Sequence, residues 1–411
     1  ASFAETSNSV IQNKNKDSNS IFKNSILLAE YPGSYLGFDT LKITVTGTRT
    51  ERAVKDVPGA LSSFDYDEIN EIGPLSWREI FKYDASISSQ DFTRSDGERA
   101  YASGDKGNIN IRGVEGNRIL TLIDGIPIPR FSYGRSGTFA ASRLNYIDFS
   151  NLGQVEVLKG PGSSLYGSDA MGGVVSLRSI RPDDILEDGQ KNTIEISSPY
   201  NSQNSSYQPS LKYAFREDDF SGIIALSTGT FEELNRKTKK KYTNDLDGNL
   251  NSYYGKFIKS SVNTDYDITF ETLNKDTTSK GSSYYNDEKS LSSQTDKRDS
   301  ERTRISLGVN YESDEDRFID NFSAQIYSNN MENKSDYETI SLASARGGAT
   351  DSNTKVTLKQ EMLGGNIQLS NDFETNGVDQ KLTYGFELNH NDASRLRKAF
   401  TNNVLTGDYK A

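Results

Sequence analysis

The chain has 411 residues, with 47 Lys and Arg against 58 Asp and Glu, so its formal net charge of −11 argues against nucleic acid as a partner. It contains no Cys and one His, which excludes a disulfide framework, a thiolate metal site and a metal centre built from several histidines. Only 33% of its residues are hydrophobic, yet 22 are Tyr and 19 are Phe, a composition typical of a large transmembrane β-barrel.

The first fifty residues are polar and carry one short extended pattern. Residues 1–38 are rich in Asn, Ser and Lys, and we expect a flexible N-terminal arm there, either of the mature protein or left from a leader sequence. Within 39–50, β-branched residues follow one another at Ile43, Thr44, Val45 and Thr46. Such a segment can add as a strand to a partner protein, or it can be the first strand of the next domain.

A change in composition marks a separate domain over 51–182. Seventeen of the 33 glycines lie between residues 41 and 180, and short apolar runs alternate with them. The local patterns predict helices at Asp67–Glu71 and Ser76–Lys82, and strands at Ile109–Ile111, Ile119–Ile123 and Gln154–Leu158. The prediction is a small mixed α+β domain.

From residue 190 to 411 the side chains alternate with a period of two. Tyr266, Ile268 and Phe270, for example, alternate with Thr269 and Glu271. The same alternation recurs at 211–216, 304–311 and 381–388, and it predicts strands of about ten residues with one apolar and one polar face. A soluble β-sandwich would also alternate in this way.

The connections between these strands favour the barrel. Three links are short: Glu217–Asp219, Val262–Thr264 and Ser313–Arg317. Three others are long and polar: Glu232–Leu250, Lys275–Glu301 and Asn333–Thr354. Short turns on one side and long loops on the other are typical of outer-membrane barrels, and compact soluble domains rarely carry several loops of that length.

Four motifs occur in order along the first half of the chain. They are DTLKITVTGTR at 39–49, NINIRG at 108–113, LIDGIP at 122–127 and VEVLKGPGSSLYGSDAMGGVV at 155–175. With these motifs the sequence resembles the TonB-dependent outer-membrane receptors. The resemblance covers residues 40–182 closely and the strand pattern of 190–411 loosely.

The resemblance implies a mixed α+β plug domain over 51–182, preceded by a TonB box and linker at 39–50. It implies that 190–411 is the N-terminal part of a large antiparallel transmembrane β-barrel. The plug motif residues are then Ile111, Arg112, Gly113, Asp124, Gly125, Glu156, Gly160, Pro161, Tyr166, Gly167, Gly172 and Gly173. The implied partners are outer-membrane lipid and the inner-membrane TonB–ExbB–ExbD complex. The implied location is the outer membrane of a Gram-negative-type bacterium, with plug and TonB box facing the periplasm.

Charged residues of the plug motifs are expected to lie between plug and barrel wall. Arg112, Asp124, Glu156 and Arg178 form the predicted buried polar network, because charges removed from water need partners. The network acts either as a latch or as scaffolding.

Strand number bears on the extent of the chain. A pore that encloses a plug of roughly 130 residues belongs to the large, 22-stranded class, whereas 190–411 holds about ten strand candidates. We therefore expect a fragment whose barrel continues beyond residue 411, since unpaired strand edges are not stable in lipid. The alternative is a self-sufficient ten-stranded barrel, whose lumen is too narrow for the plug.

No pair of catalytic groups is evident, so we expect a transporter and not an enzyme, without a permanently bound cofactor. The stretches 113–120 and 165–175 look most like the haem and haemoglobin receptors of the family, so haem or a ferric chelate is the expected transported ligand. Receptors for ferric siderophores, cobalamin or other nutrients are the alternatives within this architecture. A surface adhesin or signalling barrel without transport is the alternative from another class.

Candidate ligand residues are few. The plug contains no His, in contrast to the haem receptor pattern, and His390 continues the lipid-facing parity of Phe386 and Leu388, so it is interpreted as an interfacial residue. Tyr can ligate haem iron, which makes Tyr133 and its neighbour Arg135 candidates for contact with haem or an anionic siderophore. The alternative is a solvent-facing loop.

Overall fold

The computed structural model describes residues 43–44, 52–53, 59–89, 109–129, 146–202, 204–232, 244–284, 291–313, 319–341 and 349–404. All of them belong to one compact unit, Ile43–Ala411. Within these ranges no helix is both long and apolar enough to cross a membrane. The predicted arm at 1–38 lies outside the described residues, as do Val45, Thr46, Tyr133 and Arg135.

A five-stranded mixed sheet forms the centre of the N-terminal domain, in the order β3-β9-β10-β7-β8. Its strands are β3 (Ala60–Phe64), β7 (Ile119–Ile123), β8 (Ile126–Pro127), β9 (Leu152–Lys159) and β10 (Gly173–Ser179). Strand β10 is parallel to β7 and antiparallel to β9. The predicted strands at 119–123 and 154–158 are confirmed, the second with two further residues at its start.

Short helices accompany this sheet. Helix α1 (Tyr66–Ile72) begins after Asp65, whose carboxylate accepts from the Glu68 N–H while the Glu68 carboxylate accepts from the Asp65 N–H. The further helices among the described residues are α2 (Trp77–Ile80), α4 (Ser163–Tyr166), α5 (Pro182–Ile185) and the 3₁₀ turns η3 (Gly116–Arg118) and η5 (Phe149–Asn151). Both predicted helices exist, and the mixed α+β class of the domain is confirmed.

Two small sheets complete the N-terminal part. Strands β4 (Ile87–Ser89), β5 (Ile109–Ile111) and β6 (Val114–Glu115) form one of them, which confirms the predicted strand at 109–111. Strands β1 (Ile43–Thr44) and β2 (Arg52–Ala53) form the other, an antiparallel pair in which Ile43 lies opposite Ala53.

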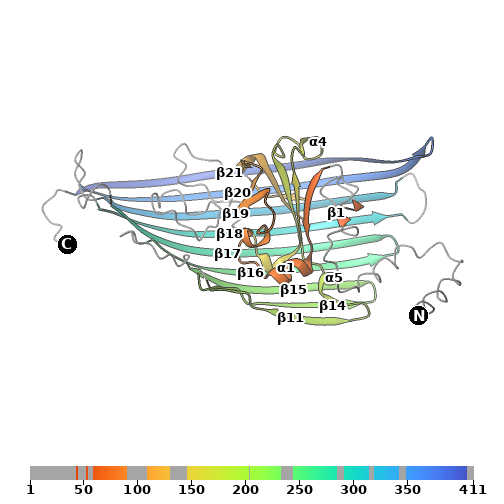
Figure 1. The fold of residues 1–411 in the computed structure, drawn as a ribbon, viewed down its shortest axis with the longest axis horizontal. Coiled ribbons are helices and arrows are strands. Elements are labelled where there is room, and N and C mark those ends of the chain that lie inside the picture. The colour runs from red at the N-terminus through yellow and green to blue at the C-terminus, as the bar shows by residue number, and fades with distance from the viewer. Residues whose placement is uncertain are drawn as a thin grey trace, which may run out of the picture. The chain divides into compact units, whose positions relative to one another are not determined.

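The second half of the chain forms an eleven-stranded sheet. Its main path is β11 (Asn192–Ser197), β14 (Ser210–Glu217), β15 (Phe220–Glu232), β16 (Asn244–Ser261), β17 (Thr264–Tyr284), β18 (Leu291–Glu312), β19 (Asn321–Ser341), β20 (Ala349–Thr375) and β21 (Val378–Val404), and β12 (Tyr200–Asn201) and β13 (Ser206–Tyr207) lie beside it. Neighbours on the path are antiparallel, and the elements of the N-terminal domain lie across one face of this large sheet (Figure 1). Among the described residues β11 and β21 each pair on one side, so the sheet is open.

The two faces of the large sheet differ as the alternation predicts. In β17, Tyr266, Ile268 and Phe270 are exposed, whereas Thr269 and Glu271 are buried. Exposed apolar side chains at the matching positions of neighbouring strands include Leu211, Tyr213, Ile224, Leu226, Ile305, Leu307, Phe386 and Leu388. They form an outward apolar belt, and His390 lies on the same outward face of β21, opposite Leu363 of β20.

The predicted strand length of about ten residues is wrong for most of the sheet. Strands β17 to β21 have 21, 22, 21, 27 and 27 residues. Parts of β16 to β20 lie in the three segments predicted as long loops. The reason lies in the side chains beyond the apolar belt, where Ser, Thr, Asn and charged residues occupy both faces. The backbone ladder continues there, but the apolar period of two that marks a strand in sequence is lost.

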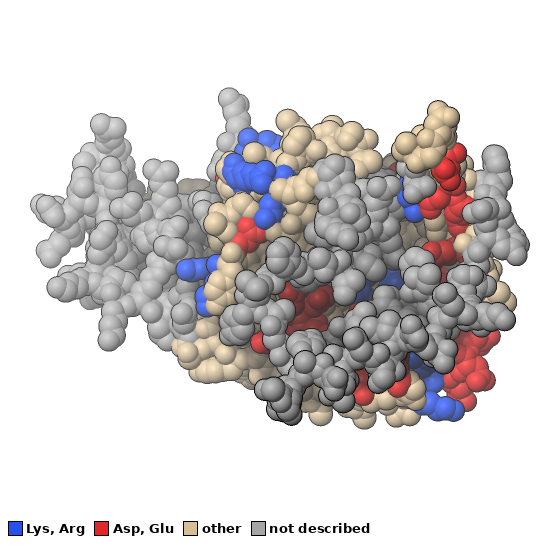
Figure 2. All heavy atoms as spheres, turned by 45° about the vertical axis from the view of Figure 1, so that its right-hand side comes forward, with Lys and Arg blue, Asp and Glu red and all other residues tan. Residues whose placement is uncertain are grey.

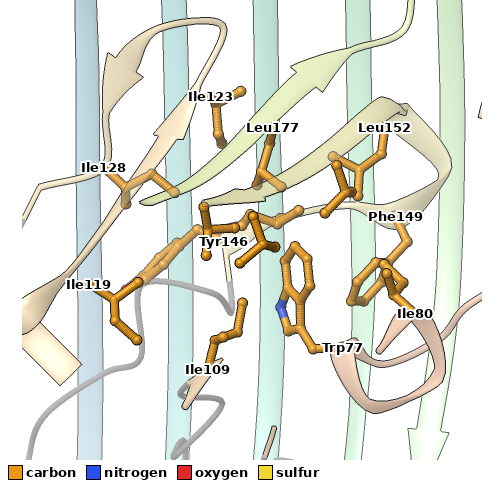
Figure 3. Close-up of a cluster of buried hydrophobic side chains, with 14 of the residues drawn as sticks. Trp77, Ile80, Ile109, Ile119, Ile123, Ile128, Tyr146, Phe149, Leu152 and Leu177 are labelled. Atoms are coloured by element: carbon orange, nitrogen blue, oxygen red, sulfur yellow. The ribbon is translucent and has the colours of Figure 1, made fainter. Parts of the chain in front are cut away.

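The main apolar core lies inside the N-terminal domain. Trp77 packs edge-on against Phe149, with ring centroids 5.0 Å apart, and Ile80, Tyr146 and Leu177 are buried around them (Figure 3). Three residues of the large sheet join this cluster: Met331, Val356 and Leu358. The core therefore extends onto the inner face of β19 and β20, and it fixes the N-terminal domain against that part of the sheet.

Candidate functional site

The β7–β8 turn carries the carboxylate that links the N-terminal domain to the large sheet. Asp124 and Gly125 form a two-residue hairpin turn with φ angles of 49° and 76°, the left-handed pair that an Asp-Gly sequence favours. The Asp124 carboxylate accepts hydrogen bonds from the Ser179 N–H at 2.8 Å and from Ser179 Oγ at 2.5 Å. The turn is thereby held to β10, and the charge of Asp124 lies at the domain surface that faces the sheet.

Tyr254 of β16 meets the same place from the large sheet. Its hydroxyl lies 2.8 Å from the Ile180 carbonyl oxygen and 2.9 Å from Ser179 Oγ. Since the Ser179 hydroxyl donates to Asp124, this buried tyrosine connects the sheet to the hydrogen bonds of the β7–β8 turn.

Two arginines of β18 and one glutamate of β17 complete the arrangement. Arg304 Nη1 donates to Asp124 Oδ2 at 2.8 Å, and Arg304 Nε donates to Glu271 Oε2 at 3.1 Å. Arg302 Nη2 donates to the other oxygen of Glu271. Both guanidinium groups are fully buried, so each depends on carboxylates for its compensation. We call Asp124, Ser179, Tyr254, Glu271, Arg302 and Arg304 the Asp124 cluster.

The positive and negative side chains around this cluster balance only when those of the N-terminal domain and those of the large sheet are counted together. Lys256 of β16 lies 3.8 Å from Asp267 of β17 and next to the cluster. Burial alone would raise the pKa of Asp124, but the positive charges of Lys256 and Arg304 and the hydrogen bonds from Ser179 hold that pKa well below its usual range. Asp124 is therefore ionised at neutral pH. Three cations then face three carboxylates: Lys256, Arg302 and Arg304 against Asp267, Glu271 and Asp124.

A second carboxylate, that of Asp148, is held by neutral donors. Its oxygens accept from Gln208 Nε2 and from the hydroxyl of Ser227 on β15. They also accept from the Ser150 N–H at the start of η5, and the neighbouring Asn151 donates to Ser252 of β16 at 3.0 Å. This contact joins the domain to β15 and β16 without an ion pair.

A third contact is formed by Tyr66 of α1. Its hydroxyl lies 2.7 Å from both carboxylate oxygens of Glu195 on β11, and Lys212 Nζ of β14 donates to the Tyr66 oxygen at 2.9 Å. Burial and the hydrogen bond to Glu195 raise the pKa of Tyr66 well above its usual value. Its phenol thus stays neutral and acts as a donor.

The four charged residues predicted to form one network are divided in the structure. Of Arg112, Asp124, Glu156 and Arg178, it is Asp124 that forms an ion pair with the large sheet. Arg178 pairs with both oxygens of Asp184 at 2.7 and 2.8 Å, within the N-terminal part. The Arg112 side chain is exposed and donates to the Lys159 carbonyl oxygen, and Glu156 is buried and accepts from Gln154. The reason is topological, because β9 lies inside the five-stranded sheet and the Arg112 turn lies away from the wall.

The other motif residues shape the backbone of the domain. Gly173 has a φ of 155°, and a Cβ there would lie 2.5 Å from the Leu158 carbonyl oxygen. A Cβ on Gly172 would lie 2.3 Å from a methyl group of Val114. The remaining residues are core or turn positions: Ile111 in β5, Gly113 and Gly125 in turns, Gly160, Pro161 and Gly167 around α4, and Tyr166 in α4.

A comparison with known protein families identifies the N-terminal domain. The family model described as TonB-dependent Receptor Plug Domain matches residues 53–174. The N-terminal domain is therefore a plug domain of the TonB-dependent receptor type, and the large antiparallel sheet resembles the barrel wall of such receptors.

Individual relatives agree with this assignment. The chain is 29% identical to lactoferrin-binding protein A of Neisseria meningitidis serogroup B over 190 residues, 44% of this chain and 19% of that protein. Heme/hemopexin utilization protein C of Haemophilus influenzae is 36% identical over 95 residues, 23% of this chain and 12% of that protein. These matches therefore span less than a fifth of the length of either relative.

A solved structure supports the fold at low sequence identity. The ferripyoverdine receptor of the Pseudomonas aeruginosa outer membrane aligns with a TM-score of 0.60 at 14% identity. The alignment covers 87% of this chain and 46% of that receptor chain, so the shared fold includes both the plug and the sheet.

The predicted TonB box is described only in part. Ile43 and Thr44 form β1 and pair with β2, outside the five-stranded plug sheet. One side of β1 is thus already occupied within the chain, and among the described residues no strand pairs with its other side.

Sequence analysis missed several residues of the plug–sheet contact. Asp148 is the clearest example of a residue that was missed. It is an acidic residue in the apolar run Tyr146–Phe149, and burial of a carboxylate without a partner costs so much free energy that its presence there predicts one. Glu271 and Arg304 were placed on the polar face of their strands by parity, but parity does not reveal which inward charges meet each other. That pairing depends on the register between β17 and β18, which places Glu271 opposite Arg304.

Proposed function

We propose that this protein is an outer-membrane receptor that imports an iron-bearing ligand, energised from the inner membrane by TonB with ExbB and ExbD. It is a transport receptor and not an enzyme, and haem or a ferric chelate is its cargo and not a resident cofactor. The observation that carries the proposal is a family-matched plug seated on the polar inner face of a sheet whose outer face is an apolar belt.

The orientation in the membrane follows from the turns. Links such as 218–219 and 262–263 are two residues long, whereas the strands extend far past the apolar belt at their other ends. Outer-membrane barrels keep short turns in the periplasm and long elements outside. This supports a plug and TonB box that open toward the periplasm, and a wall of β17 to β21 that extends outside the lipid.

Haem, free or protein-bound, is the favoured ligand. The support is the match of 36% identity to a protein named for haem and hemopexin utilisation, together with a further relative named a hemin receptor. Tyr133 and Arg135 remain the proposed ligand contacts, on sequence grounds alone. Ferric siderophores and cobalamin are the alternative cargoes of the same architecture.

A second candidate ligand is an iron-carrying protein. Two relatives matched over 190 and 193 residues are named for binding lactoferrin and transferrin. These matches are as long as the 192-residue match to the hemin receptor, and they support a receptor that takes iron from such a carrier.

The test is uptake by cells in which this receptor is the one route for the ligand. Radioactive iron supplied as haem, and separately as iron-loaded transferrin, should enter cells with intact TonB and should not enter cells without it. Haem titration of the full-length receptor, followed at the Soret band, gives binding independently of transport, and loss of the shift on Tyr133→Phe would assign that ligand. Uptake of neither form of iron would overturn the proposed cargo.

A further inference from the structure

The inward side chains of β18 form a polar row along the plug. In chain order they are Gln294, Asp296, Arg298, Ser300, Arg302 and Arg304, each two residues from the next and therefore on one face of the strand. The row runs from the end of β18 that follows residues 285–290 toward the end that leads to the short turns. In the proposed orientation it begins outside and ends beside Asp124.

Several polar atoms of this row are buried without a partner. Arg302 uses Nη2 for Glu271, whereas its Nε and Nη1 have none, although the side chain is 1% exposed. Gln294 is 6% exposed, and neither its amide nitrogen nor its amide oxygen has a partner. Because buried donors are satisfied in nearly all structures, the row requires water or an acceptor supplied from elsewhere.

The charges around the Asp124 cluster indicate that this acceptor is an anion. Around the Asp124 cluster the sheet contributes three cations and two carboxylates, and the plug contributes the third carboxylate, Asp124. When the plug moves away from the wall, Asp124 leaves with it, and Arg304 loses one of its two counter-ions. The sheet then retains one uncompensated positive charge on its inner face, which attracts an anion there.

The net charge of the chain does not supply such a field. The chain carries a net charge of −11, and the face seen in Figure 2 shows groups of Lys and Arg side chains beside groups of Asp and Glu side chains. Attraction of an anion is therefore a property of the inner row and not of the protein as a whole.

We propose that the inner face of β18 is an anion path for the imported ligand. A carboxylate or phosphate group of the ligand binds first to Arg302 and then to Arg304. At Arg304 this group replaces Asp124 as the counter-ion when the plug moves. This inference rests on the proposed transport function and names the chemistry of its ligand. Guanidinium groups suit the role because they bind carboxylate and phosphate in a bidentate way. The exchange keeps the charge around Arg304 balanced while the ligand passes.

Ion selectivity of the full-length receptor tests the path without knowledge of the ligand. The receptor is placed in a planar lipid bilayer, the plug is released with urea, and the reversal potential is measured in a potassium chloride gradient. Arg304→Gln and Arg302→Gln should each lower the chloride-to-potassium permeability ratio, and Arg304→Lys should retain it because the charge is kept. Asp124→Asn should leave the ratio unchanged, since in the open state this residue has left the wall.

The outcomes are distinct. Equal ratios in the parent and in both Gln variants would overturn the path, as would a change in Asp124→Asn as large as that in Arg304→Gln. If Arg304→Gln fails to insert, Arg302→Gln decides, because it leaves the Asp124–Arg304 pair intact. A receptor without TonB-dependent uptake contradicts the proposed function, but it does not alter the selectivity result.

Transport then separates the sources of the anion. Haem carries two carboxylates and its dimethyl ester carries none, while ferric citrate represents carboxylate chelates. Arg302→Gln should lower uptake of haem or of ferric citrate by about tenfold, the effect of losing a charge-assisted hydrogen bond, and should not alter uptake of the ester. An equal loss for haem and its ester would contradict recognition of the carboxylates.

Discussion

The plug and the large sheet distribute apolar and polar side chains in opposite ways. The plug buries apolar side chains such as Trp77 and Phe149 in its centre and has Asp124 and Asp148 at its boundary. The sheet instead has its apolar side chains, such as Tyr266, on the outward face. Where the two meet, polar groups of the sheet therefore find their partners in the plug. The plug therefore stabilises the inner face of the sheet by pairing with its polar groups. The outward apolar belt has to be covered by something other than the plug, which in the proposed function is lipid.

The largest expected effect concerns the strand that must be reached from inside. Val45→Pro should abolish TonB-dependent uptake, because proline removes a backbone donor from the segment proposed to pair with TonB. Uptake of radioactive ligand by whole cells measures it, and Val45→Ile serves as the matched control. Normal uptake in the proline variant would contradict the proposal that TonB pairs with this segment and moves the plug.

Breaking the charged contact between plug and sheet should have the next largest effect. Arg304→Ala leaves Asp124 and Glu271 with one partner fewer in a buried place, and removal of one member of a buried ion pair typically costs about 3–5 kcal/mol. Denaturation of the full-length receptor is followed by fluorescence of Trp77, the single tryptophan of residues 1–411, with any tryptophan beyond residue 411 replaced by Phe, and it then reports on the plug. Lys359→Ala removes an exposed pair with Glu361 and should change the same midpoint little. Equal effects of both variants would show that the cluster does not fix the plug.

The outward belt provides a test of what covers the sheet. Leu307 is exposed in the middle of β18, and Leu307→Lys should destabilise the protein in lipid by about 2–4 kcal/mol if the belt faces the hydrocarbon. Folding from urea into lipid vesicles measures the loss. The control is Asn330→Lys, an exposed position of β19 beyond the belt, opposite Thr303 and Glu361. A loss no larger than that of the control would return the sheet to the soluble β-sandwich alternative.

The smallest effect compares glycines of the two regions. Gly173→Ala in the plug places a methyl group against the Leu158 carbonyl oxygen and should cost about 1–3 kcal/mol, as overpacked sites do. Gly255→Ala in β16 meets its nearest atom at 3.6 Å, an ordinary contact, and should be close to neutral. Chemical denaturation resolves the difference. Similar losses of unfolding free energy at both positions would mean that the plug and the sheet accommodate an added methyl group equally well.

Local patterns predicted α1, α2, β5, β7 and β9 of the plug, whereas β3, β4 and β10 were not predicted. The Asp65–Glu68 capping box marks the start of α1, and Asp124-Gly125 marks a hairpin turn that the structure contains. The strand faces of 264–271 and 304–309 also followed from parity. The lengths of β17 to β21 did not, because outside the apolar belt both faces are polar and the period that identifies a strand disappears.

The sequence by itself determined the two kinds of region, the α+β plug and the alternating sheet, because helix caps, turns and side-chain parity depend on residues close together in the chain. Tertiary structure alone decided which charges meet. Arg112 and Glu156 stand in plug motifs as Asp124 does, yet it is Asp124 that forms an ion pair with the sheet, since its turn lies at the β7–β8 end that faces β18. Its partner Arg304 is 180 residues away, and a contact of that kind depends on how two separately folded surfaces pack.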